Sequence, residues 1–205
     1  MIELYEGLPG TGKTLQVTER LVKERRHYDE VITNYGLELP DPAPPVRRIR
    51  SGPEFIDLVM ELLYEPDGKN RVIALDEAHS LMDARHWTRT PDEALMFFAQ
   101  PRKAKIDLFL TAQDWSQIEQ RVRIVTNYVW RCNGWGKDFN FRNECHLIFW
   151  ANCYAWHDYA RKGERAKVRG TRMFTYRKAN KFGQYYDTME VLKRIDLSQK
   201  AAVTA

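Results

Sequence analysis

The sequence feature that most restricts the fold is a glycine-rich run of eight residues near the N-terminus. Residues 7–14 read Gly-Leu-Pro-Gly-Thr-Gly-Lys-Thr and match the pattern Gly-x-x-x-x-Gly-Lys-Thr. Residues 1–6 before this run predict a β-strand, and residues 13–27 after it carry apolar side chains at helical spacing. A strand, a glycine-rich turn and a helix in this order predict a phosphate-binding loop in an α/β protein.

Each residue type in this loop has a chemical reason to be there. Glycines let successive backbone N–H groups turn inward around phosphate oxygens, and the N-terminus of the following helix adds positive potential. Lys13 can reach the β- and γ-phosphates, and the hydroxyl of Thr14 can bind Mg²⁺. We therefore expect ATP and Mg²⁺ as cofactors. The residues predicted to bind the nucleotide are Gly7, Pro9, Gly10, Thr11, Gly12, Lys13 and Thr14.

A second motif, VIALDEAH at residues 72–79, predicts the acidic part of the same site. The apolar residues favour a buried strand, so Asp76 and Glu77 would come at its carboxyl end. Asp76 would hold Mg²⁺ together with Thr14. Glu77 would orient and deprotonate a water for attack on the γ-phosphate, which distinguishes triphosphate hydrolases from kinases. The alternative for Glu77 is an acidic residue that only stabilises a helix N-terminus.

Gln113 and two arginines complete the predicted catalytic set. Gln113 follows the predicted strand at residues 106–111, where its amide could contact the γ-phosphate or the attacking water. Arg121 and Arg123 are candidates for an arginine that a neighbouring subunit provides to stabilise charge on the transferring phosphoryl group. The predicted catalytic residues are Lys13, Glu77, Gln113, Arg121 and Arg123.

Predicted strands and helices alternate along the first 135 residues. The strands are expected at 1–6, 30–33, 71–75, 106–111 and 128–132, and the helices at 13–27, 51–66, 91–99 and 116–123. The alternation predicts an α/β fold with a mainly parallel sheet and helices on both faces, which is the architecture that a P-loop NTPase needs. A Pro-rich stretch at residues 39–46 is expected to be a surface excursion.

The alternation stops beyond residue 135. Residues 146–156 and 171–176 predict two strands joined by a basic turn, and residues 188–195 predict a short helix. We therefore expect a C-terminal β-hairpin appendage. A chain of 205 residues fits one domain, with an ATPase core at 1–135 and a basic C-terminal part at 136–205.

Basic charge is concentrated in the C-terminal part of the chain. Residues 121–205 contain 17 Lys and Arg against 7 Asp and Glu, whereas residues 1–120 contain 15 against 21. Residues 161–181 hold nine of these cations, one acidic residue and interleaved aromatic rings. This composition favours DNA as a partner, bound through residues 161–181 or through loops, although a basic solvated surface explains the same residues.

The sequence gives no sign of export or membrane insertion. Its three cysteines are an odd number without a secretory leader, which argues against a disulfide framework. The longest apolar-leaning segment, residues 146–156, is about half as long as a membrane span requires. We expect no transmembrane segment, and a location in the cytoplasm of a host cell or in association with a virion.

Four stretches in order, MIELYEGLPGTGKT, EVITN, VIALDEAHSLMDAR and IDLFLTAQD, followed by Arg121, make the chain resemble the Zot-type ATPases over about residues 1–135. That group belongs to the additional-strand P-loop ATPases that are similar to FtsK and HerA, so the resemblance implies a P-loop NTPase fold of the RecA-like, additional-strand type. It includes filamentous-phage assembly proteins and relatives of the DNA-packaging ATPases of tailless viruses. The resemblance implies ATP-driven DNA movement, with the roles given above for Lys13, Thr14, Asp76, Glu77 and Gln113.

The resemblance implies a viral genome-packaging ATPase that forms a homo-oligomeric ring of about five or six subunits. A capsid vertex or assembly proteins would be its further partners. Filamentous-phage assembly ATPases continue into a membrane-spanning helix, which we do not expect here, so assembly or extrusion is the second prediction.

A small-molecule kinase is a further alternative, since residues 161–172 could mimic an arginine-rich lid, but Glu77 is not expected in such an enzyme. Residues 76–79 also spell the DEAH signature of helicases, which need a second RecA-like domain. A non-enzymatic nucleotide clamp is the third alternative. It is disfavoured because every expected type of catalytic residue is present.

Overall fold

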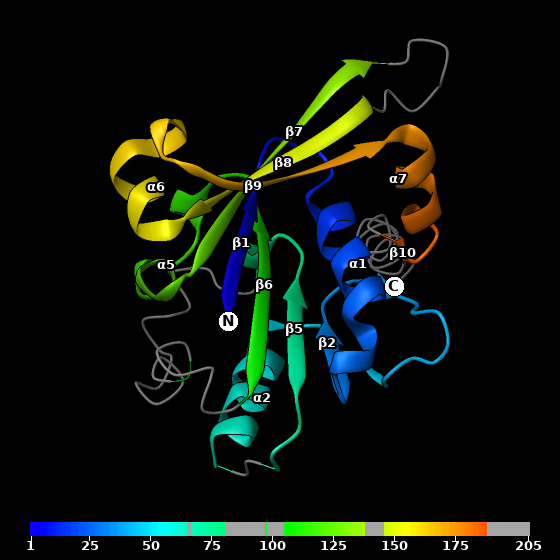
Figure 1. The fold of residues 1–205 in the computed structure, drawn as a ribbon. Coiled ribbons are helices and arrows are strands. Elements are labelled where there is room, and N and C mark those ends of the chain that lie inside the picture. Colours follow the sequence, from blue (N-terminus) through cyan, green and yellow to red (C-terminus); the bar gives the residue numbers. More distant parts are fainter. Residues whose placement is uncertain (65–66, 81–96, 98–104, 138–145, 188–205) are drawn as a thin grey trace, which may run out of the picture.

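A mainly parallel sheet forms the centre of the structure (Figure 1). The computed structural model describes residues 1–64, 67–80, 97, 105–137 and 146–187. Within these residues eight strands form one sheet in the order β4-β2-β5-β6-β1-β7-β8-β9. The strands are β1 (Ile2–Glu6), β2 (Glu30–Thr33), β4 (Val46–Arg48), β5 (Arg71–Leu75), β6 (Ile106–Ala112), β7 (Tyr128–Lys137), β8 (His146–Ala155) and β9 (Val168–Thr175). All pairs from β4 to β7 are parallel, whereas β8 is antiparallel to both β7 and β9.

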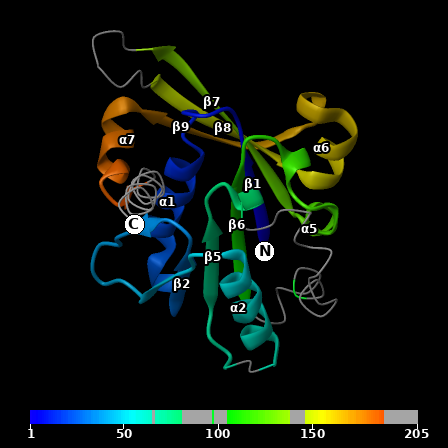
Figure 2. The same ribbon diagram turned by 180° about the vertical axis from the view of Figure 1, so that it is seen from behind.

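Helices cover both faces of this sheet (Figures 1 and 2). The α-helices are α1 (Lys13–Glu24), α2 (Gly52–Tyr64), α5 (Gln120–Val125), α6 (Trp156–Lys162) and α7 (Tyr176–Gly183). Short 3₁₀ helices are η1 (Arg25–His27), η2 (Ala78–Ser80), η3 (Trp115–Gln117) and η4 (Gly163–Arg165). The predicted fold, a mainly parallel sheet with helices on both faces, is confirmed. Among the described residues, no helix combines the length and the apolar character needed to cross a bilayer.

The two faces of the sheet carry separate apolar clusters because successive side chains of a strand point to opposite faces. In β1, Ile2 and Leu4 pack with residues of α2, α5 and α6 in one cluster. Tyr5 packs with Val17 and Leu21 of α1 in the other. Every residue of β1 and β5 is buried. Burial on both faces explains the apolar run at residues 72–75 of β5, whereas β1 also buries two carboxylates, Glu3 and Glu6.

The C-terminal strands belong to the main sheet. β8 and β9 pair antiparallel, as the predicted hairpin requires, but β8 also pairs with β7 and so extends the sheet. Their connection contains α6 and η4 where the sequence predicted only a basic turn. Tyr159 and Ala166 in this connection are buried against the core, and the many surrounding cations hid their apolar spacing.

Several shorter elements differ from the sequence-based expectations. The helix predicted at 116–123 is divided into η3 and α5, because the Glu119 side chain accepts hydrogen bonds from two backbone N–H groups and starts a new helix. The helix α7 and a small antiparallel pair of β3 (Gly36–Leu37) with β10 (Tyr186–Asp187) were not predicted. The helix predicted at 188–195 lies outside the described residues, as does the one at 91–99 except for the buried Phe97.

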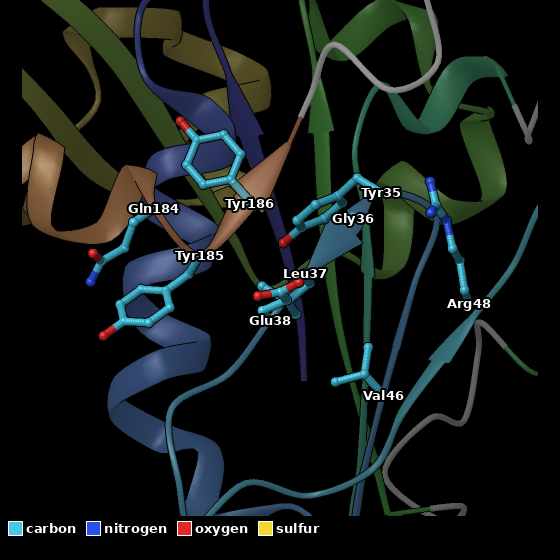
Figure 3. A pocket seen from close by; sticks show the side chains of 9 residues that line it. All are labelled: Tyr35, Gly36, Leu37, Glu38, Val46, Arg48, Gln184, Tyr185 and Tyr186. Carbon is cyan, nitrogen blue, oxygen red and sulfur yellow. The ribbon is translucent and has the colours of Figure 1, made fainter. Parts of the chain in front are cut away.

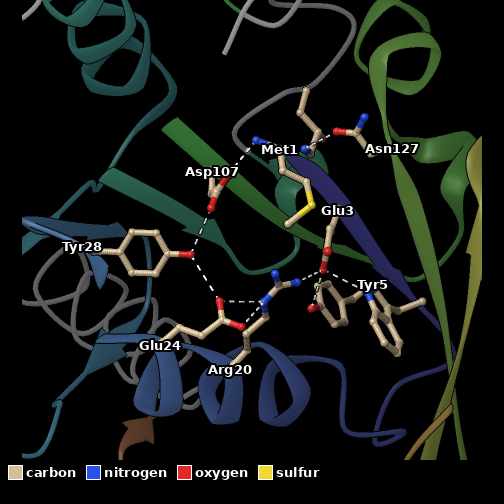
Figure 4. Close-up of polar contacts among 10 residues, drawn as sticks. Met1, Glu3, Tyr5, Arg20, Glu24, Tyr28, Asp107 and Asn127 are labelled. Atoms are coloured by element: carbon tan, nitrogen blue, oxygen red, sulfur yellow. Dashed lines mark hydrogen bonds and ion pairs between the residues drawn. The ribbon is translucent and has the colours of Figure 1, made fainter. Parts of the chain in front are cut away.

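A buried polar cluster fixes α1 on the sheet (Figure 4). The Arg20 guanidinium on α1 forms an ion pair with the Glu3 carboxylate of β1 and also contacts Glu24 at 3.0 Å. The same Glu3 oxygen accepts hydrogen bonds from the Tyr5 hydroxyl at 3.0 Å and from Trp130 Nε1 at 2.9 Å. Glu3 is therefore a buried carboxylate whose charge is balanced by one arginine.

A second set of contacts fixes the start of β1, at the opposite end of the sheet from the glycine-rich loop. The N-terminal ammonium of Met1 lies 2.7 Å from Asp107 Oδ1 of β6, and the Tyr28 hydroxyl donates to Oδ2 of the same carboxylate at 3.1 Å. The Asn127 side chain accepts a hydrogen bond from the Ile2 backbone N–H at 2.8 Å. The central strand is thus held in register with both of its neighbours.

Loss of the Arg20 charge should destabilise the fold. Arg20→Met keeps most of the side-chain volume but leaves the Glu3 carboxylate buried without its cation, which should cost about 3–5 kcal/mol. Arg47→Met is the matched control, because Arg47 pairs with Glu61 at 3.1 Å on an exposed surface and such pairs contribute less than about 1 kcal/mol. Urea unfolding measures both, and equal midpoints for the two variants would contradict this assignment.

Candidate functional site

The glycine-rich loop at residues 7–14 lies between β1 and α1 and is shaped by close backbone contacts. Gly7 has a φ of 153°, and a Cβ atom there would lie 2.4 Å from the carbonyl oxygen of Cys132 in β7. Gly12 has a left-handed conformation with φ 79° at the start of α1, and its Cβ would lie 3.0 Å from the ring of Phe149. Glycine is therefore required at both positions.

The residue of β7 that lies against Gly7 is Cys132, and its thiol is unreactive. Cys132 is buried, and burial raises the pKa of its thiol to about 12. The thiol therefore stays protonated and unreactive at neutral pH.

The ammonium group of Lys13 is buried against the backbone of the glycine-rich loop. Its Nζ atom donates hydrogen bonds to the carbonyl oxygens of Gly7 at 3.0 Å and Leu8 at 3.3 Å. The same atom lies 3.7 Å from Oε1 of Glu77. Two residues that are 64 positions apart in the sequence thus meet through opposite charges.

Asp76 joins the loop to the neighbouring strands through hydroxyl groups. Its Oδ1 atom accepts hydrogen bonds from the hydroxyls of Thr14 and Thr111, each at 2.7 Å. A threonine hydroxyl and a carboxylate at this separation supply two oxygen ligands of the kind that Mg²⁺ prefers, and Mg²⁺ usually takes its other ligands from water and phosphate. Thr14 and Asp76 therefore fit the metal that the sequence predicts.

Asn34 holds the backbone of Asp76. The Asn34 amide donates to the carbonyl oxygen of Asp76 and accepts from its N–H, both at 2.7 Å. Asn34 follows β2, the strand next to β5, so these two bonds fix the carboxyl ends of the two strands relative to each other. The sequence did not predict this role, although the polar residue directly after the predicted strand at 30–33 was a visible sign.

Glu77 has a backbone conformation that is uncommon for a residue with a side chain. Its φ is 45°, and its N–H donates to the Thr111 hydroxyl at 2.9 Å. A non-glycine residue in this region costs free energy and is often found at functional sites. The Glu77 carboxylate lies between Lys13 and the imidazole of His79, whose Nδ1 is 3.4 Å from Oε2. The turn after β5 therefore directs this carboxylate toward the loop.

The remaining predicted catalytic residues lie farther from this cluster of contacts. Gln113 is exposed and directly follows β6, which lies between β5 and β1 in the sheet. Arg121 is exposed on α5. Arg123 is half-buried, with its guanidinium 4.8 Å from the centre of the Trp115 ring. Lys13, Thr14, Asp76 and Glu77 thus come together as predicted, Gln113 reaches the same edge of the sheet, and the two arginines lie on a neighbouring helix.

A cleft of about 540 Å³ adjoins this edge of the sheet (Figure 3). Tyr35, Tyr185 and Tyr186 line it, from segments that the pairing of β3 with β10 brings together, and Arg48 lines it from β4. Tyr35 directly follows Asn34, whose amide bonds the backbone of Asp76, so the cleft lies next to the acidic part of the site. Burial, with a smaller contribution from the negative charge of Asp76, raises the pKa of Tyr186 to about 12. The sequence did not predict the cleft because its walls are far apart along the chain.

The family model for the zonular occludens toxin (Zot) matches residues 1–188. The chain belongs to the Zot family. No curated protein matches the sequence. The predicted Zot-type resemblance is therefore confirmed and extends beyond the residues 1–135 on which it was based.

Solved structures share the fold. The N-terminal domain of zonular occludens toxin from Neisseria meningitidis aligns with a TM-score of 0.60 at 18% identity, covering 91% of this chain and 98% of that one. The genome packaging NTPase B204 from Sulfolobus turreted icosahedral virus 2, in complex with ATP-gammaS, aligns with a TM-score of 0.55 at 12% identity, covering 83% and 96%. The DNA-packaging ATPase B204 from Sulfolobus turreted icosahedral virus gives 0.56 at 13% identity, covering 82% and 96%. The Zot-family chain therefore has the fold of these P-loop NTPases.

The Thr111 hydroxyl should be needed for turnover in this Zot-family site. Thr111→Val keeps the shape but removes the bond to the Asp76 carboxylate and the acceptor for the Glu77 N–H, so nucleotide hydrolysis should fall about 10-fold to 100-fold. Thr111→Ser keeps the hydroxyl and should retain most of the activity. Phosphate release under saturating nucleotide measures both variants. Wild-type turnover in Thr111→Val, or equal loss in both, would contradict this role.

Proposed function

We propose that this chain is an ATP-hydrolysing motor that moves viral DNA. The observation that carries the proposal is the position of Glu77, one residue beyond Asp76 and 3.7 Å from the ammonium of Lys13. A carboxylate at this point is the group that activates water in triphosphate hydrolases. A kinase site of the same fold would instead need a place for an acceptor hydroxyl.

The residues of the loop would hold the triphosphate. Backbone N–H groups at the start of α1 and the ammonium of Lys13 would bind its oxygens, and the oxygens of Thr14 and Asp76 would hold Mg²⁺. Bound Mg²⁺ would supply neutralisation of charge on the phosphate oxygens. The carbonyl groups of Gly7 and Leu8 that Lys13 contacts at 3.0 and 3.3 Å would then give way to phosphate as its partners.

Glu77 would act as the general base. The oxygen of a water molecule would attack the γ-phosphorus while the bond from that phosphorus to the β–γ bridging oxygen breaks, and the water proton would pass to the Glu77 carboxylate. Thr111 supports this step by holding the backbone of Glu77 through a 2.9 Å hydrogen bond. Gln113 would orient the water or sense the γ-phosphate from the end of β6.

A neighbouring copy of the chain would complete the site in a homo-oligomeric ring. Charge on the transferring phosphoryl group calls for an arginine, and an arginine finger can come from another subunit. Arg121 is the better of the two candidates, because it is exposed while Arg123 packs on Trp115.

DNA would bind the basic segment of residues 161–169, which runs from the end of α6 through η4 to the start of β9. Its cations Arg161, Lys162, Arg165, Lys167 and Arg169 are all exposed. They fall within the segment for which the sequence predicts DNA contact, and exposed cations close together favour a polyanion.

Two viral roles fit a DNA-moving ATPase. Genome packaging, with a capsid vertex as partner, is our first choice and is supported by the similarity of the fold to the B204 packaging ATPases. Filamentous-phage assembly is the second and is favoured by membership of the Zot family.

Glu77→Gln should retain nucleotide binding while turnover falls at least about 100-fold, because the amide cannot accept the water proton. Glu61→Gln, the same change on the exposed surface of α2, is the matched control and should keep wild-type turnover. Nucleotide titration and release of inorganic phosphate measure the two properties. Unchanged turnover in Glu77→Gln would remove it from this role, and a phosphorylated acceptor in place of free phosphate would favour a kinase.

The same variant separates the two viral roles. A virus that carries Glu77→Gln should produce empty capsids if the ATPase packages the genome. It should instead leave DNA inside the host without released particles if the ATPase serves filamentous assembly.

DNA should stimulate hydrolysis in a salt-dependent way. Replacing Arg161, Lys162, Arg165 and Lys167 together by glutamine should weaken DNA binding and lower the salt dependence of log K by up to about 0.9 for each lost phosphate contact. The control replaces the exposed Lys69 and Lys105, which precede β5 and β6 at the opposite edge of the sheet, and should change neither. Undiminished stimulation in the fourfold variant would relocate the DNA contact.

A further inference from the structure

We propose that Glu6 is a positioning residue that couples the basic segment of residues 161–169 to the nucleotide site. The inference rests on the proposed function, since it assigns the route by which bound DNA would reach the catalytic groups. Glu6 is the last residue of β1 and directly precedes Gly7, and it is fully buried, at 0% exposure. A carboxylate in this position touches the base of the phosphate-binding loop through the chain itself.

Three elements meet at the Glu6 carboxylate. Its Oε1 atom accepts a hydrogen bond from the Tyr159 hydroxyl of α6 and another from Arg131 Nη1 of β7 at 3.1 Å. Its Oε2 atom accepts from the backbone N–H of Trp115 at 3.1 Å. Helix α6, strand β7 and the connection after β6 are therefore joined at one buried charged group.

Two side chains, Arg131 and Glu164, connect the Glu6 carboxylate to the surface. Arg131 Nε lies 3.1 Å from the Glu164 carboxylate of η4, whose side chain is 66% exposed. Glu164 stands among the cations to which the proposed function assigns DNA. A polyanion on this surface would approach Arg165 and repel Glu164, and Arg131 would transmit the change to Glu6.

The Glu6 carboxylate is also bonded to the segment that carries Gln113. Trp115 is two residues beyond Gln113, so the hydrogen bond from its N–H fixes the segment that carries the predicted sensor. The Trp115 ring also packs edge-on against Trp156, the first residue of α6, with ring centres 5.5 Å apart. Helix α6 thus contacts this segment directly through a ring and indirectly through Glu6.

Burial makes these contacts interdependent. A carboxylate out of reach of water needs all of its donors, because each one lost leaves charge without a partner. A shift of α6 that withdraws the Tyr159 hydroxyl therefore favours a compensating shift of Glu6, and with it of Gly7 and Trp115. Binding at one surface and the geometry of the nucleotide site are linked by this requirement, and the linkage acts in both directions.

Tyr159→Phe removes one donor while keeping the ring in the core. DNA affinity should stay within about 2-fold of wild type, whereas the ratio of DNA-stimulated to basal ATP hydrolysis should fall at least about 5-fold. Tyr154→Phe is the matched control, since Tyr154 is a buried tyrosine whose ring packs against Tyr159 with centres 5.1 Å apart. It should keep full stimulation. Full stimulation in Tyr159→Phe would overturn the proposal.

A readout without DNA separates this proposal from the proposed function. Amide hydrogen exchange of α6 should slow when a non-hydrolysable ATP analogue binds to the wild-type chain, and this response should be lost in Tyr159→Phe but kept in Tyr154→Phe. An α6 that does not respond in the wild type would overturn the coupling even if DNA stimulates hydrolysis. A responding α6 in a chain that DNA neither binds nor stimulates would support the coupling and reject the DNA-moving function.

Discussion

The parallel register of β5, β6 and β1 is the constraint on which the rest of the site depends. In this register Leu75 lies opposite Leu110, and Ala112 lies opposite Glu6. The carboxyl ends of the three strands therefore meet at one edge of the sheet, where open α/β sheets bind their ligands. Each chain segment that leaves this edge carries one part of the candidate site: the glycine-rich loop after β1, the acidic pair after β5 and the amide of Gln113 after β6. The chemistry of the site follows from strand order as much as from residue type.

The sequence predicted the parts of the site whose residue type and spacing carry chemical meaning. Lys13, Thr14, Asp76 and Glu77 lie together as expected, because the glycine-rich loop and the acidic pair follow the carboxyl ends of two parallel strands. Thr111 and the amide of Asn34 could not be found in this way, since each acts on a backbone group more than 30 residues away. The extension of the sheet by β8 and β9 was hidden for a related reason, because pairing between distant strands leaves no local pattern.

Strand β1 carries two buried carboxylates that serve opposite layers of the molecule. Glu3 takes its cation from α1 on one face, whereas Glu6 takes its donors from α6, β7 and the connection after β6 on the other. Buried acids are costly unless they are fully bonded, so each fixes the geometry of its partners more strictly than an apolar side chain would. Glu3 and Glu6 together fix β1 to elements on both faces of the sheet, and β1 leads directly into the glycine-rich loop.

The contact between Gly7 and β7 has a consequence for how such sequences can diverge. The atom that excludes a side chain at position 7 is the backbone carbonyl oxygen of Cys132, 2.4 Å from where a Cβ would lie. Every amino acid at position 132 presents the same oxygen, so substitutions along β7 can accumulate without relaxing the demand for glycine. The requirement for glycine at position 7 is therefore set by the backbone of β7 and not by the identity of any side chain on that strand.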